Sequence, residues 1–362
     1  MKAIIAGGGT GGHIFPAIAI AAALEKQVPG IELLFVGAAG KMEMEKVPAA
    51  GYKIIGLTIA GFNRSNILKN ITLPFKLIKS FFQVRSILSS FKPDFVVGVG
   101  GYSTFPVLKM AQAKGIPTFI HEANSFAGKS NQMLAKNAAA IFTGTGGMET
   151  FFPVNKLFVT GNPVRENIIA ASHTREAAHH FFGLNPNKKT ILIVGGSLGA
   201  NSINEVIYHN LDAFASLDLQ LVWQTGKTNA SKYANAATKY SNVWVGAFIA
   251  EMDMAYAVAD TVISRAGAMS VAEICVAGKP AVFVPYPFAA EDHQTANANY
   301  LVNNHAALLV PDAQAAATLF NTVTALALDS AQQQTFIQNL QPLAIKNAAE
   351  VVASKILQYL RA

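Results

Sequence analysis

A histidine and a run of glycines stand together near the start of the chain, in AGGGTGGHIFP (residues 6–16). Glycines leave the main chain bare enough for a substrate to approach closely. An imidazole titrates near neutral pH, so it can take a proton from a reacting hydroxyl. We therefore regard His13 as the first candidate general base, and Glu122, which follows His121, as the second. The alternative role for His13 is a hydrogen bond that only orders its loop.

Gly7, Gly9 and Gly12 also match G-x-G-x-x-G, the fingerprint of a dinucleotide-binding loop. Dinucleotide enzymes carry an acidic residue at the end of the next strand, where it binds the adenosine ribose. Here that strand ends in VGAAGK (residues 36–41), which holds no acid. An imidazole beside the first helical turn would also crowd a pyrophosphate. A nicotinamide-dependent oxidoreductase is therefore a secondary alternative.

Later segments carry groups that could hold a nucleotide. In GGSLGAN (residues 195–201) the N–H groups at a helix start could bind a diphosphate, helped by the Ser197 hydroxyl. A tight turn without a ligand is the alternative. Glu273 could accept both hydroxyls of a ribose, or could be a solvated helix residue. The polar residues 292–295 follow an apolar stretch, which places them at the carboxyl end of a strand, where open α/β sheets bind ligands.

The sequence indicates neither a metal site nor a cofactor. No Asp-x-Asp pair occurs in the chain, and the histidines lack the spacing of metal ligands, so we expect no dedicated Mg²⁺ or Mn²⁺ site. The single cysteine, Cys275, excludes an internal disulfide and fits a reducing compartment. Its apolar neighbours predict a buried, inert thiol.

The elements that position these residues follow from the hydrophobic pattern. Short apolar runs typical of buried strands, such as 31–37, alternate with segments of helical period, such as 74–91. This alternation predicts an α/β fold with doubly wound parallel sheets. The pattern pauses at residues 159–168 and restarts at residues 190–207 with a new strand, glycine loop and helix.

A chain of 362 residues, 51% of them hydrophobic, is long enough for two cores. We therefore predict two Rossmann-like domains, residues 1–160 and 161–344. The last amphipathic segment, 345–362, has no strand after it to cover, and we expect it to pack back on the first domain.

Positive charge is concentrated in the first half of the chain. Eight basic residues and no acidic residue lie between Glu45 and Asp94. The positive charge of this segment therefore exceeds the net charge of the whole chain, which is +7. Aliphatic and aromatic residues interleave with the basic ones, which favours an anionic membrane surface over nucleic acid as the partner. No apolar run reaches the roughly 18–20 residues of a membrane span, so we expect a soluble or surface-bound protein. The expected membrane face comprises Ile67, Leu68, Lys69, Phe75, Lys76, Lys79 and Phe82.

Taken together and in this order, seven segments resemble the MurG family. They are GGGTGGHIFP, GVGGYSTFP, HEAN, GNPVR, GGSLGAN, SRAGAMSVAE and EDHQTANA. Members of this family are bacterial enzymes of the GT-B fold that transfer N-acetylglucosamine from UDP-N-acetylglucosamine to lipid I, which forms lipid II. The resemblance spans residues 3 to about 300. It implies a GT-B fold with a cleft between the two Rossmann-like domains.

The resemblance also implies roles for individual residues. It places Asn124 on the donor sugar, Arg165 and Ser197 on the phosphates, and Ile249 near the uracil. The full set that it places on donor or acceptor is Thr10, Gly11, Gly12, Tyr102, Asn124, Arg165, Ser197, Ile249, Ala268, Met269, Ser270, Val271, Ala272, Glu273, Gln294 and Thr295. Two positions depart from the family pattern: Thr295 replaces a second glutamine, and Leu198 stands where glutamine is frequent.

The implied reaction is an inverting transfer from the α-linked donor to the muramoyl 4-hydroxyl of lipid I. The implied partners are UDP-N-acetylglucosamine and lipid I, a polyprenyl-diphosphate-linked muramoyl peptide. The expected location is the cytoplasmic face of the bacterial plasma membrane, bound peripherally. The alternatives are a UDP-N-acetylglucosamine epimerase, a GT-B glycosyltransferase with a soluble acceptor, and a non-catalytic nucleotide-binding membrane protein.

Overall fold

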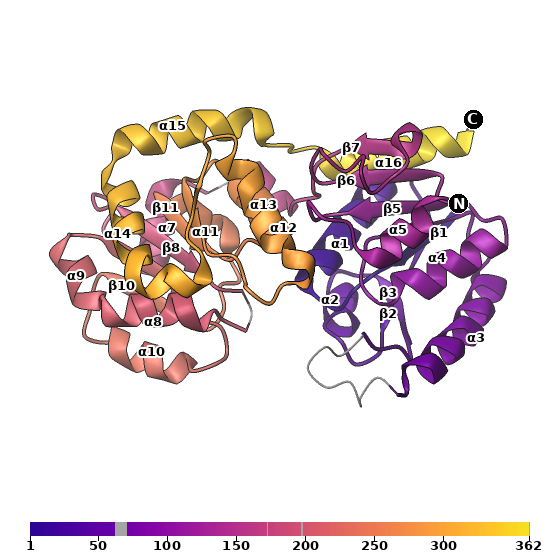
Figure 1. The fold of residues 1–362 in the computed structure, drawn as a ribbon, viewed down its shortest axis with the longest axis horizontal. Coiled ribbons are helices and arrows are strands. Elements are labelled where there is room, and N and C mark those ends of the chain that lie inside the picture. Colours follow the sequence, from indigo (N-terminus) through magenta and orange to yellow (C-terminus); the bar gives the residue numbers. More distant parts are fainter. Residues whose placement is uncertain (62–70, 172, 197, 362) are drawn as a thin grey trace. The chain divides into compact units, whose positions relative to one another are not determined.

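The computed structural model describes residues 1–61, 71–171, 173–196 and 198–361 of the chain (Figure 1). The chain forms two compact units, one of residues 1–165 with 346–362 and the other of residues 166–345. Each unit contains one sheet, and every strand pair in both sheets is parallel. The predicted α/β class with two doubly wound sheets is therefore confirmed.

The first unit has a sheet of order β3-β2-β1-β4-β5-β6-β7. Its strands are β1 (Lys2–Ala6), β2 (Glu32–Ala38), β3 (Lys53–Leu57), β4 (Phe95–Gly98), β5 (Thr118–Glu122), β6 (Ala140–Thr143) and β7 (Leu157–Val159). Its described α-helices are α1 (Gly11–Gln27), α2 (Glu43–Ala49), α3 (Leu73–Phe91), α4 (Thr104–Ala113), α5 (Lys129–Ala135) and α16 (Ala348–Arg361).

The second unit has a sheet of order β10-β9-β8-β11-β12-β13. Its strands are β8 (Thr190–Val194), β9 (Gln220–Gln224), β10 (Val243–Gly246), β11 (Thr261–Ser264), β12 (Ala281–Phe283) and β13 (Leu308–Leu309). Its described α-helices are α6 (Glu166–Ala170), α7 (Arg175–Phe182), α8 (Asn201–His209), α9 (Leu211–Ser216), α10 (Ala230–Ala237), α11 (Met252–Val258), α12 (Ala268–Val276), α13 (His293–Val302), α14 (Ala315–Leu328) and α15 (Ser330–Leu340).

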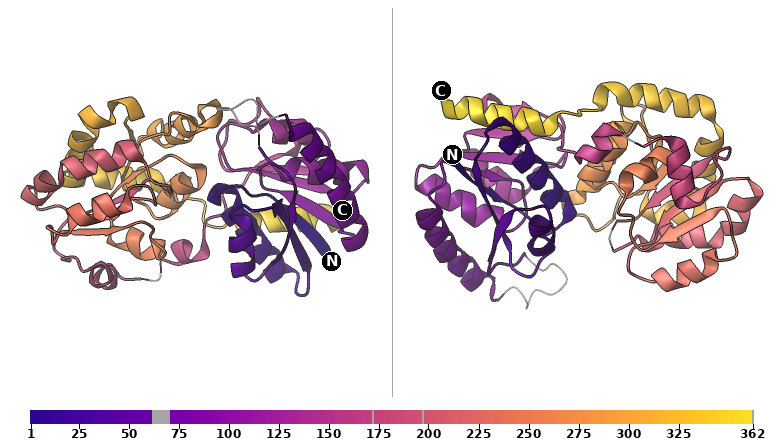
Figure 2. Two further views of the ribbon diagram at one scale, coloured as in Figure 1. Left: turned by 90° about the horizontal axis from the view of Figure 1, so that it is seen from below. Right: turned by 180° about the vertical axis from the view of Figure 1, so that it is seen from behind.

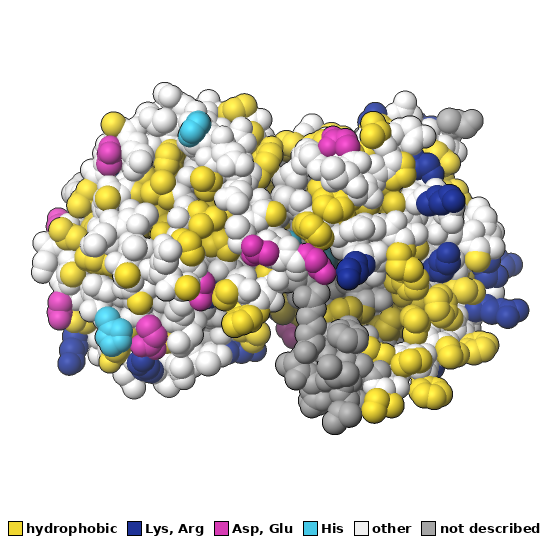
Figure 3. Space-filling view, in the orientation of Figure 1, with side chains coloured by type: hydrophobic (Ala, Val, Ile, Leu, Met, Phe, Trp, Pro, Cys, Tyr) yellow, Lys and Arg dark blue, Asp and Glu magenta, His cyan; other side chains and the backbone are white. Residues whose placement is uncertain are grey.

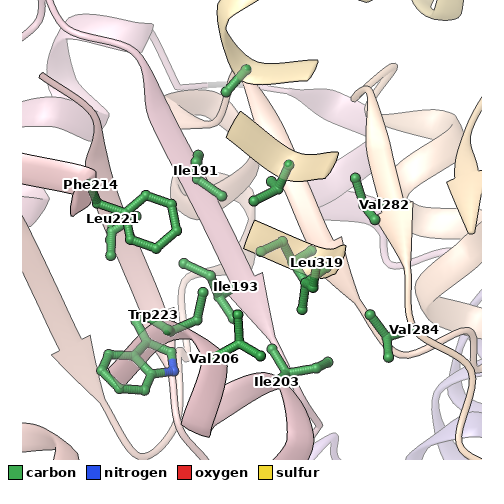
Figure 4. Close-up of a cluster of buried hydrophobic side chains, with 14 of the residues drawn as sticks. Ile191, Ile193, Ile203, Val206, Phe214, Leu221, Trp223, Val282, Val284 and Leu319 are labelled. Atoms are coloured by element: carbon green, nitrogen blue, oxygen red, sulfur yellow. The ribbon is translucent and has the colours of Figure 1, made fainter. Parts of the chain in front are cut away.

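Successive residues of the central strands are buried on opposite faces of each sheet. Ala3 and Ile5 of β1 belong to a core with α1 and α16, while Ile4 belongs to a core with α3, α4 and α5. Because both faces are covered, the central strands are apolar at most positions, as is typical of parallel sheets. In the second unit, Ile193 of β8 and Trp223 of β9 lie in one such core (Figure 4).

The C-terminal helix completes the first unit. The helix α16 packs beside α1, as the views in Figure 2 show, and its Val352 and Ile356 are fully buried. The Tyr359 ring meets the Phe119 ring of β5 edge-on, with centroids 5.6 Å apart. The helix thus covers an apolar face that α1 and the strands would otherwise expose. Across the described part of the chain, none of the helices combines the length and apolar character needed to cross a bilayer.

The strand order indicates where each sheet can bind a ligand. In the first sheet β1 lies between β2 and β4, and in the second β8 lies between β9 and β11. At such a point the connections leave the sheet in opposite directions, and open α/β sheets bind ligands beyond the carboxyl ends of the strands there. The glycine loops that follow β1, β4 and β8 therefore lie where such sheets bind ligands.

Candidate functional site

His13 lies in the first turn of α1, two residues after the helix begins at Gly11. Its Nδ1 is 3.1 Å from the carbonyl oxygen of Gly8 and 3.3 Å from Oγ1 of Thr10. A carbonyl oxygen only accepts hydrogen bonds, so the contact with Gly8 places the ring proton on Nδ1. In that tautomer Nε2 is the nitrogen able to accept a proton from a substrate.

The two glycine loops of the first unit fit against each other around this imidazole. A Cβ on Gly100 would lie 2.8 Å from Nε2 of His13, and a Cβ on Gly101 would lie 2.2 Å from the carbonyl oxygen of Gly8. Gly100 and Gly101 also have positive φ angles of 95° and 88°. Glycine is therefore required at both positions for steric and conformational reasons.

Glu122 is at the end of β5 and is only 4% exposed. Its Oε1 accepts hydrogen bonds from the main-chain N–H of Asn124 and from the Asn124 side chain. Its Oε2 accepts hydrogen bonds from the N–H of Gly128 and from the Asn131 side chain, at 3.0 and 2.9 Å. Four donors thus hold this carboxylate, which favours a role in ordering the loop that carries Asn124 over a role as a base.

Other expected residues of the first unit lie around the same loops. The ring of Tyr102 is 48% exposed and lies 3.9 Å from where a Cβ on Gly9 would stand. The guanidinium of Arg165 lies over the ring of Phe15, 5.4 Å from its centroid. Since Phe15 belongs to α1, Arg165 brings a positive charge close to the helix start that carries His13.

His121 lies next to Glu122 on β5 and is fully buried. The pKa of its imidazole is lowered to about 4, chiefly because burial disfavours the charged form. A hydrogen bond to the Gly161 carbonyl opposes this change, and the charge of His13 contributes a smaller part of it. Its Nδ1 has no hydrogen-bond partner among the described residues. His121 is therefore neutral at physiological pH.

Glu43 is a residue of this region that the sequence analysis missed. Its side chain is 1% exposed and accepts hydrogen bonds from the N–H groups of Ala38 and Gly9. A carboxylate thus occupies the underside of the glycine loop, a position unfavourable for a bound pyrophosphate. The signal for it was Gly37 inside β2, because a glycine within a strand often marks a close approach of another group.

In the second unit, the loop after β8 packs against the loop after β9. A Cβ on Gly199 would lie 2.2 Å from the Thr225 carbonyl oxygen, and that oxygen accepts a hydrogen bond from the Asn204 side chain. Leu198 is 73% exposed, so it contributes little to the packing. Ser197, the expected phosphate ligand, lies outside the described residues.

The expected nucleoside-binding segment, 268–273, is the start of α12. Its first five residues are Ala268, Met269, Ser270, Val271 and Ala272, and Glu273 follows one turn into the helix. Glu273 is 7% exposed, and its Oε2 accepts a hydrogen bond from the Tyr256 hydroxyl at 3.4 Å. The Tyr256 hydroxyl thus orients the carboxylate.

Gln294 and Thr295 lie in the first turn of α13, which begins at His293. Oε1 of Gln294 accepts hydrogen bonds from the N–H groups of Ala266 and Tyr286, at 3.2 and 2.9 Å. This amide joins the loops that follow β11 and β12, and its NH₂ group faces the other way. The Thr295 hydroxyl donates to Asp292 at 2.7 Å, so it is already used within the loop.

Ile249, expected near the uracil, is 2% exposed, and its N–H donates to Oε1 of Gln224 at 3.0 Å. The Gln224 side chain also donates to the Gly196 carbonyl oxygen, at 3.2 Å. Gln224, which the sequence analysis missed, therefore joins the segment after β10 to the glycine loop after β8. Its signal was a polar residue at the end of an apolar strand.

Arg265 is a second residue that the sequence analysis missed in this unit. Its guanidinium donates to Asp312 at 2.6 Å, to Ser202 of α8 at 3.0 Å, and to the carbonyl oxygen of Val284 at 2.9 Å. Only 13% of its side chain is exposed. The arginine thus joins the ends of β11 and β12 to the start of α8, where the expected phosphate loop leads.

The expected membrane face is partly described. Ile67, Leu68 and Lys69 lie outside the described residues. On α3, Phe75 and Phe82 are 74% and 68% exposed, and Ile78 lies between them at 55%. These residues recur at helical spacing and share one face with Lys79, and Lys76 adjoins it. Figure 3 shows hydrophobic and basic side chains gathered on this part of the first unit.

The described residues contain no group of three or more histidine, cysteine, aspartate or glutamate side chains able to hold a metal ion. Cys275 is buried, and burial raises the pKa of its thiol to about 12. The thiol is therefore protonated at neutral pH, as expected for a core cysteine.

The family models described as Glycosyltransferase family 28 N-terminal domain and C-terminal domain match residues 3–143 and 190–353. A protein of Parabacteroides distasonis named UDP-N-acetylglucosamine--N-acetylmuramyl-(pentapeptide) pyrophosphoryl-undecaprenol N-acetylglucosamine transferase is 48% identical over 99% of this chain and 98% of its own length. A protein of the same name from Bacteroides fragilis is 47% identical over 99% of this chain and 95% of its own length.

Among solved structures, MurG of Acinetobacter baumannii is similar with a TM-score of 0.78, at 30% identity and with 99% of each chain covered. The UDP-GlcNAc 2-epimerase of Neisseria meningitidis, bound to UDP-GlcNAc, is similar with a TM-score of 0.70 over 99% of this chain and 100% of its own. Its identity of 17% shows a shared fold alone.

Proposed function

Because the chain belongs to glycosyltransferase family 28, and within it to the MurG family, we infer that it transfers N-acetylglucosamine from UDP-N-acetylglucosamine to lipid I and so forms lipid II. The observation that carries this conclusion is the identity of 48% with a curated transferase over nearly the whole of both chains. It is an enzyme of peptidoglycan synthesis.

We propose that His13 is the general base of the transfer. The muramoyl 4-hydroxyl attacks the anomeric carbon, its proton passes to Nε2 of His13, and the bond to UDP breaks with its electron pair on the diphosphate. Direct displacement converts the α-linked donor into a β-linked product. The tautomer with the proton on Nδ1, indicated by the contact with Gly8, supports this role. A base so placed contributes roughly 10²- to 10⁴-fold in rate.

We propose that Glu122 supports the site without touching the reacting atoms. Its four hydrogen bonds hold the loop of residues 123–128, and with it Asn124, which we propose contacts the donor sugar. We likewise propose that Thr10, Gly11, Gly12 and Tyr102 form the acceptor side. The first three directly precede His13 in the chain, and Tyr102 lies near Gly9 of the same loop.

We propose that the second unit binds the donor. Glu273 accepts the ribose hydroxyls, the start of α12 surrounds the nucleoside, and Ile249 lies by the uracil. The NH₂ group of Gln294 donates a hydrogen bond to the sugar, and its Oε1 is held by the loop. Thr295 does not contact the sugar, because its hydroxyl is bonded to Asp292. We propose that the glycine loop with Ser197, together with Arg165 from the end of the first unit, meets the negative charge that develops on the diphosphate. We therefore expect turnover to be unaffected by a chelator.

We propose that α3 holds the enzyme on the cytoplasmic face of the plasma membrane, in contact with anionic lipid. Phe75 and Phe82 are exposed apolar side chains that can enter the headgroup region, and Lys79 can meet anionic lipids. Such binding would let the polyprenyl tail of lipid I remain in the bilayer during transfer.

The decisive assay incubates the purified chain with UDP-N-acetylglucosamine, with and without lipid I in detergent micelles. We expect UDP release only with lipid I, and a lipid-linked disaccharide as product. Interconversion of the UDP-sugar without an acceptor would instead support the epimerase alternative, and transfer to a soluble sugar would support a different acceptor. His13→Ala should lower kcat by about 10² or more with an unchanged KM for the donor. Turnover near that of the wild type would remove His13 as the base.

A further inference from the structure

Glu43, the first residue of α2, lies beneath the loop that carries His13. Its Oε1 accepts the N–H of Ala38 at 2.9 Å, and its Oε2 accepts the N–H of Gly9 at 2.9 Å. The carboxylate therefore joins the end of β2 to the glycine loop after β1. Buried carboxylates need such donors, because desolvating an unpaired charge is very unfavourable.

The chain leaves space for this carboxylate at two glycines. A Cβ on Gly8 would lie 2.2 Å from Oε1 of Glu43, and a Cβ on Gly37 would lie 2.5 Å from its Cγ. Both distances are shorter than real contacts of a Cβ atom. Gly8 and Gly9 also have φ angles of 145° and 91°, which side chains disfavour. Any larger residue at Gly8 or Gly37 would displace Glu43.

One peptide group connects Glu43 to His13. The N–H of Gly9, which donates to Glu43, and the carbonyl of Gly8, which accepts from Nδ1 of His13, belong to the same planar unit. In a trans peptide these two groups point in opposite directions. Glu43 and His13 therefore hold opposite edges of one rigid plane, and a shift of either moves the other.

This connection affects the chemistry of the imidazole as well as its position. Hydrogen bonds in series polarise one another, so a carboxylate that accepts from the Gly9 N–H makes the Gly8 carbonyl a stronger acceptor. A stronger acceptor stabilises the proton on Nδ1 and the imidazolium that forms when Nε2 takes a second proton. Thr10 Oγ1, 3.3 Å from Nδ1, can share the same proton.

We propose that Glu43 is a positioning residue for the transfer, acting on His13 through the Gly8–Gly9 peptide. It fixes the tautomer of the ring and increases the basicity of Nε2. The substrate proton moves from the sugar hydroxyl to Nε2, while the proton on Nδ1 stays in place. This inference rests on the proposed function, because it requires His13 to be the base.

The charged or titratable groups near His13 are His121 from β5 and Arg165, whose guanidinium lies over Phe15 of the same helix. Arg165 keeps its charge at all relevant pH values. The charge interaction between His121 and His13 matters only when both are protonated, and burial lowers the pKa of His121 to about 4. His121 is thus neutral in the range where an imidazole base titrates. A change in that range on altering Glu43 therefore reports the effect of Glu43 on His13.

The test replaces Glu43 by glutamine, which has the same shape but carries no charge and offers an oxygen to only one of the two N–H donors. We expect kcat/KM for lipid I to fall about 10- to 100-fold, the range found for side chains that orient metal-bound histidines through a hydrogen bond. The acidic limb of its pH profile should move to lower pH, because the imidazolium loses a stabilising charge. The KM for UDP-N-acetylglucosamine should stay unchanged.

Two further variants serve as references. Glu43→Asp keeps the charge with a shorter side chain, so we expect a reduced rate with the acidic limb near its wild-type position. Glu45→Gln lies on the same helix, but its side chain is 76% exposed, and we expect wild-type behaviour. If Glu43→Gln does not fold, Glu43→Asp carries the test: an unchanged kcat/KM for lipid I, or an increased donor KM, would overturn the proposal.

A double-mutant cycle separates the role of Glu43 from that of His13. In a His13→Ala background, Glu43→Gln should cause no further loss of turnover. If Glu43→Gln lowers turnover equally in the wild-type and His13→Ala backgrounds, Glu43 is a structural residue only and His13 remains the base. The same conclusion follows if Glu43→Gln lowers turnover in the wild-type background without moving the acidic limb of the pH profile. Near wild-type turnover of His13→Ala alone would show that the proposed base is wrong, and this inference would fail with it.

Discussion

Buried polar side chains at this site hold main-chain groups of the loops. Glu43 accepts the N–H groups of Ala38 and Gly9, and Glu122 accepts those of Asn124 and Gly128. Loops that follow parallel strands leave N–H groups without sheet partners, and a buried carboxylate is a strong acceptor for them. Single carboxylates thus determine the loop conformations from which the proposed reacting groups project.

Glu273 offers a test of donor binding at the scale of one residue. Glu273→Gln should raise the KM for UDP-N-acetylglucosamine about 10- to 100-fold, because hydrogen bonds to a charged group contribute about 1.5–3 kcal/mol. The kcat at saturating donor should change little, since the ribose contact is made equally before and during transfer. Steady-state kinetics measure both quantities. Tyr256→Phe, which removes only the hydroxyl that donates to Glu273, should have a smaller effect. An unchanged KM in Glu273→Gln would exclude the ribose contact.

His121 should make the stability of the protein depend on pH. Its folded pKa of about 4 lies below the ordinary value of 6.5, so between these values the unfolded chain binds a proton that the folded chain does not. The contribution is complete above pH 6.5 and is lost as the pH falls toward 4, by up to roughly 3 kcal/mol. Urea unfolding at pH 7.5 and pH 5 measures this difference.

The variant His121→Gln should flatten the pH dependence of the unfolding free energy, whereas His180→Gln, at an exposed position of α7, should not. An identical slope in wild type and His121→Gln would show that His121 titrates normally in the folded protein.

At the scale of the element, α3 has two faces with different roles. Val84, Ile87 and Leu88 are buried in the core of the first unit, while Phe75, Ile78 and Phe82 are exposed. A helix that leaves several large apolar side chains exposed on one face marks an interaction surface. The sequence analysis placed Phe75 and Phe82 on the expected membrane face, and the structure adds Ile78 between them.

Phe75→Ser combined with Phe82→Ser should weaken binding to vesicles that contain anionic lipid by tenfold or more. Burying one phenylalanine contributes about 1.5–3 kcal/mol, and even partial burial of two exceeds the 1.4 kcal/mol of a tenfold change. Cosedimentation at low and high salt measures the binding, which should also fall with salt because of the lysines. Leu328→Ser, on an exposed position of α14, is the control. Equal binding of the double variant and wild type would contradict the proposed face.

At the scale of the whole molecule, each unit has its own sheet and its own cores. The chain crosses from one unit to the other near Arg165 and again near Lys346, so α16 returns to the first unit. Units with separate cores can respond separately to a ligand.

UDP should therefore stabilise mainly the second unit. At a concentration 100 times its Kd, it should add about 2.7 kcal/mol to the stability of the unit that binds it. Hydrogen exchange should slow in the loop after β8 and at the start of α12, with little change in β1–β3. The same protein with NAD in place of UDP is the matched control, and its hydrogen exchange should not slow. Equal protection of both units by UDP would argue against a donor site carried by the second unit.

The sequence by itself determined the α/β class and, through the order of its motifs, the family and the transferase activity. Strand alternation and glycine loops are local patterns, so they can be read without the fold. The apolar pattern did not reveal β7 and β13, because both strands are short and only partly buried, whereas the equally short β12 is fully buried.

Only the tertiary structure decided which polar residues act together. Glu43 and Gly9 are far apart in sequence, and so are Arg265 and Asp312, yet each pair is joined by a hydrogen bond. Glu43 and Glu45 are both glutamates of α2, two positions apart in the sequence. They differ because Glu43 lies on the side of the helix that meets the glycine loop, whereas the Glu45 side chain is exposed. Hydrogen bonding between distant segments depends on how strands are ordered in the sheet, which no local pattern encodes.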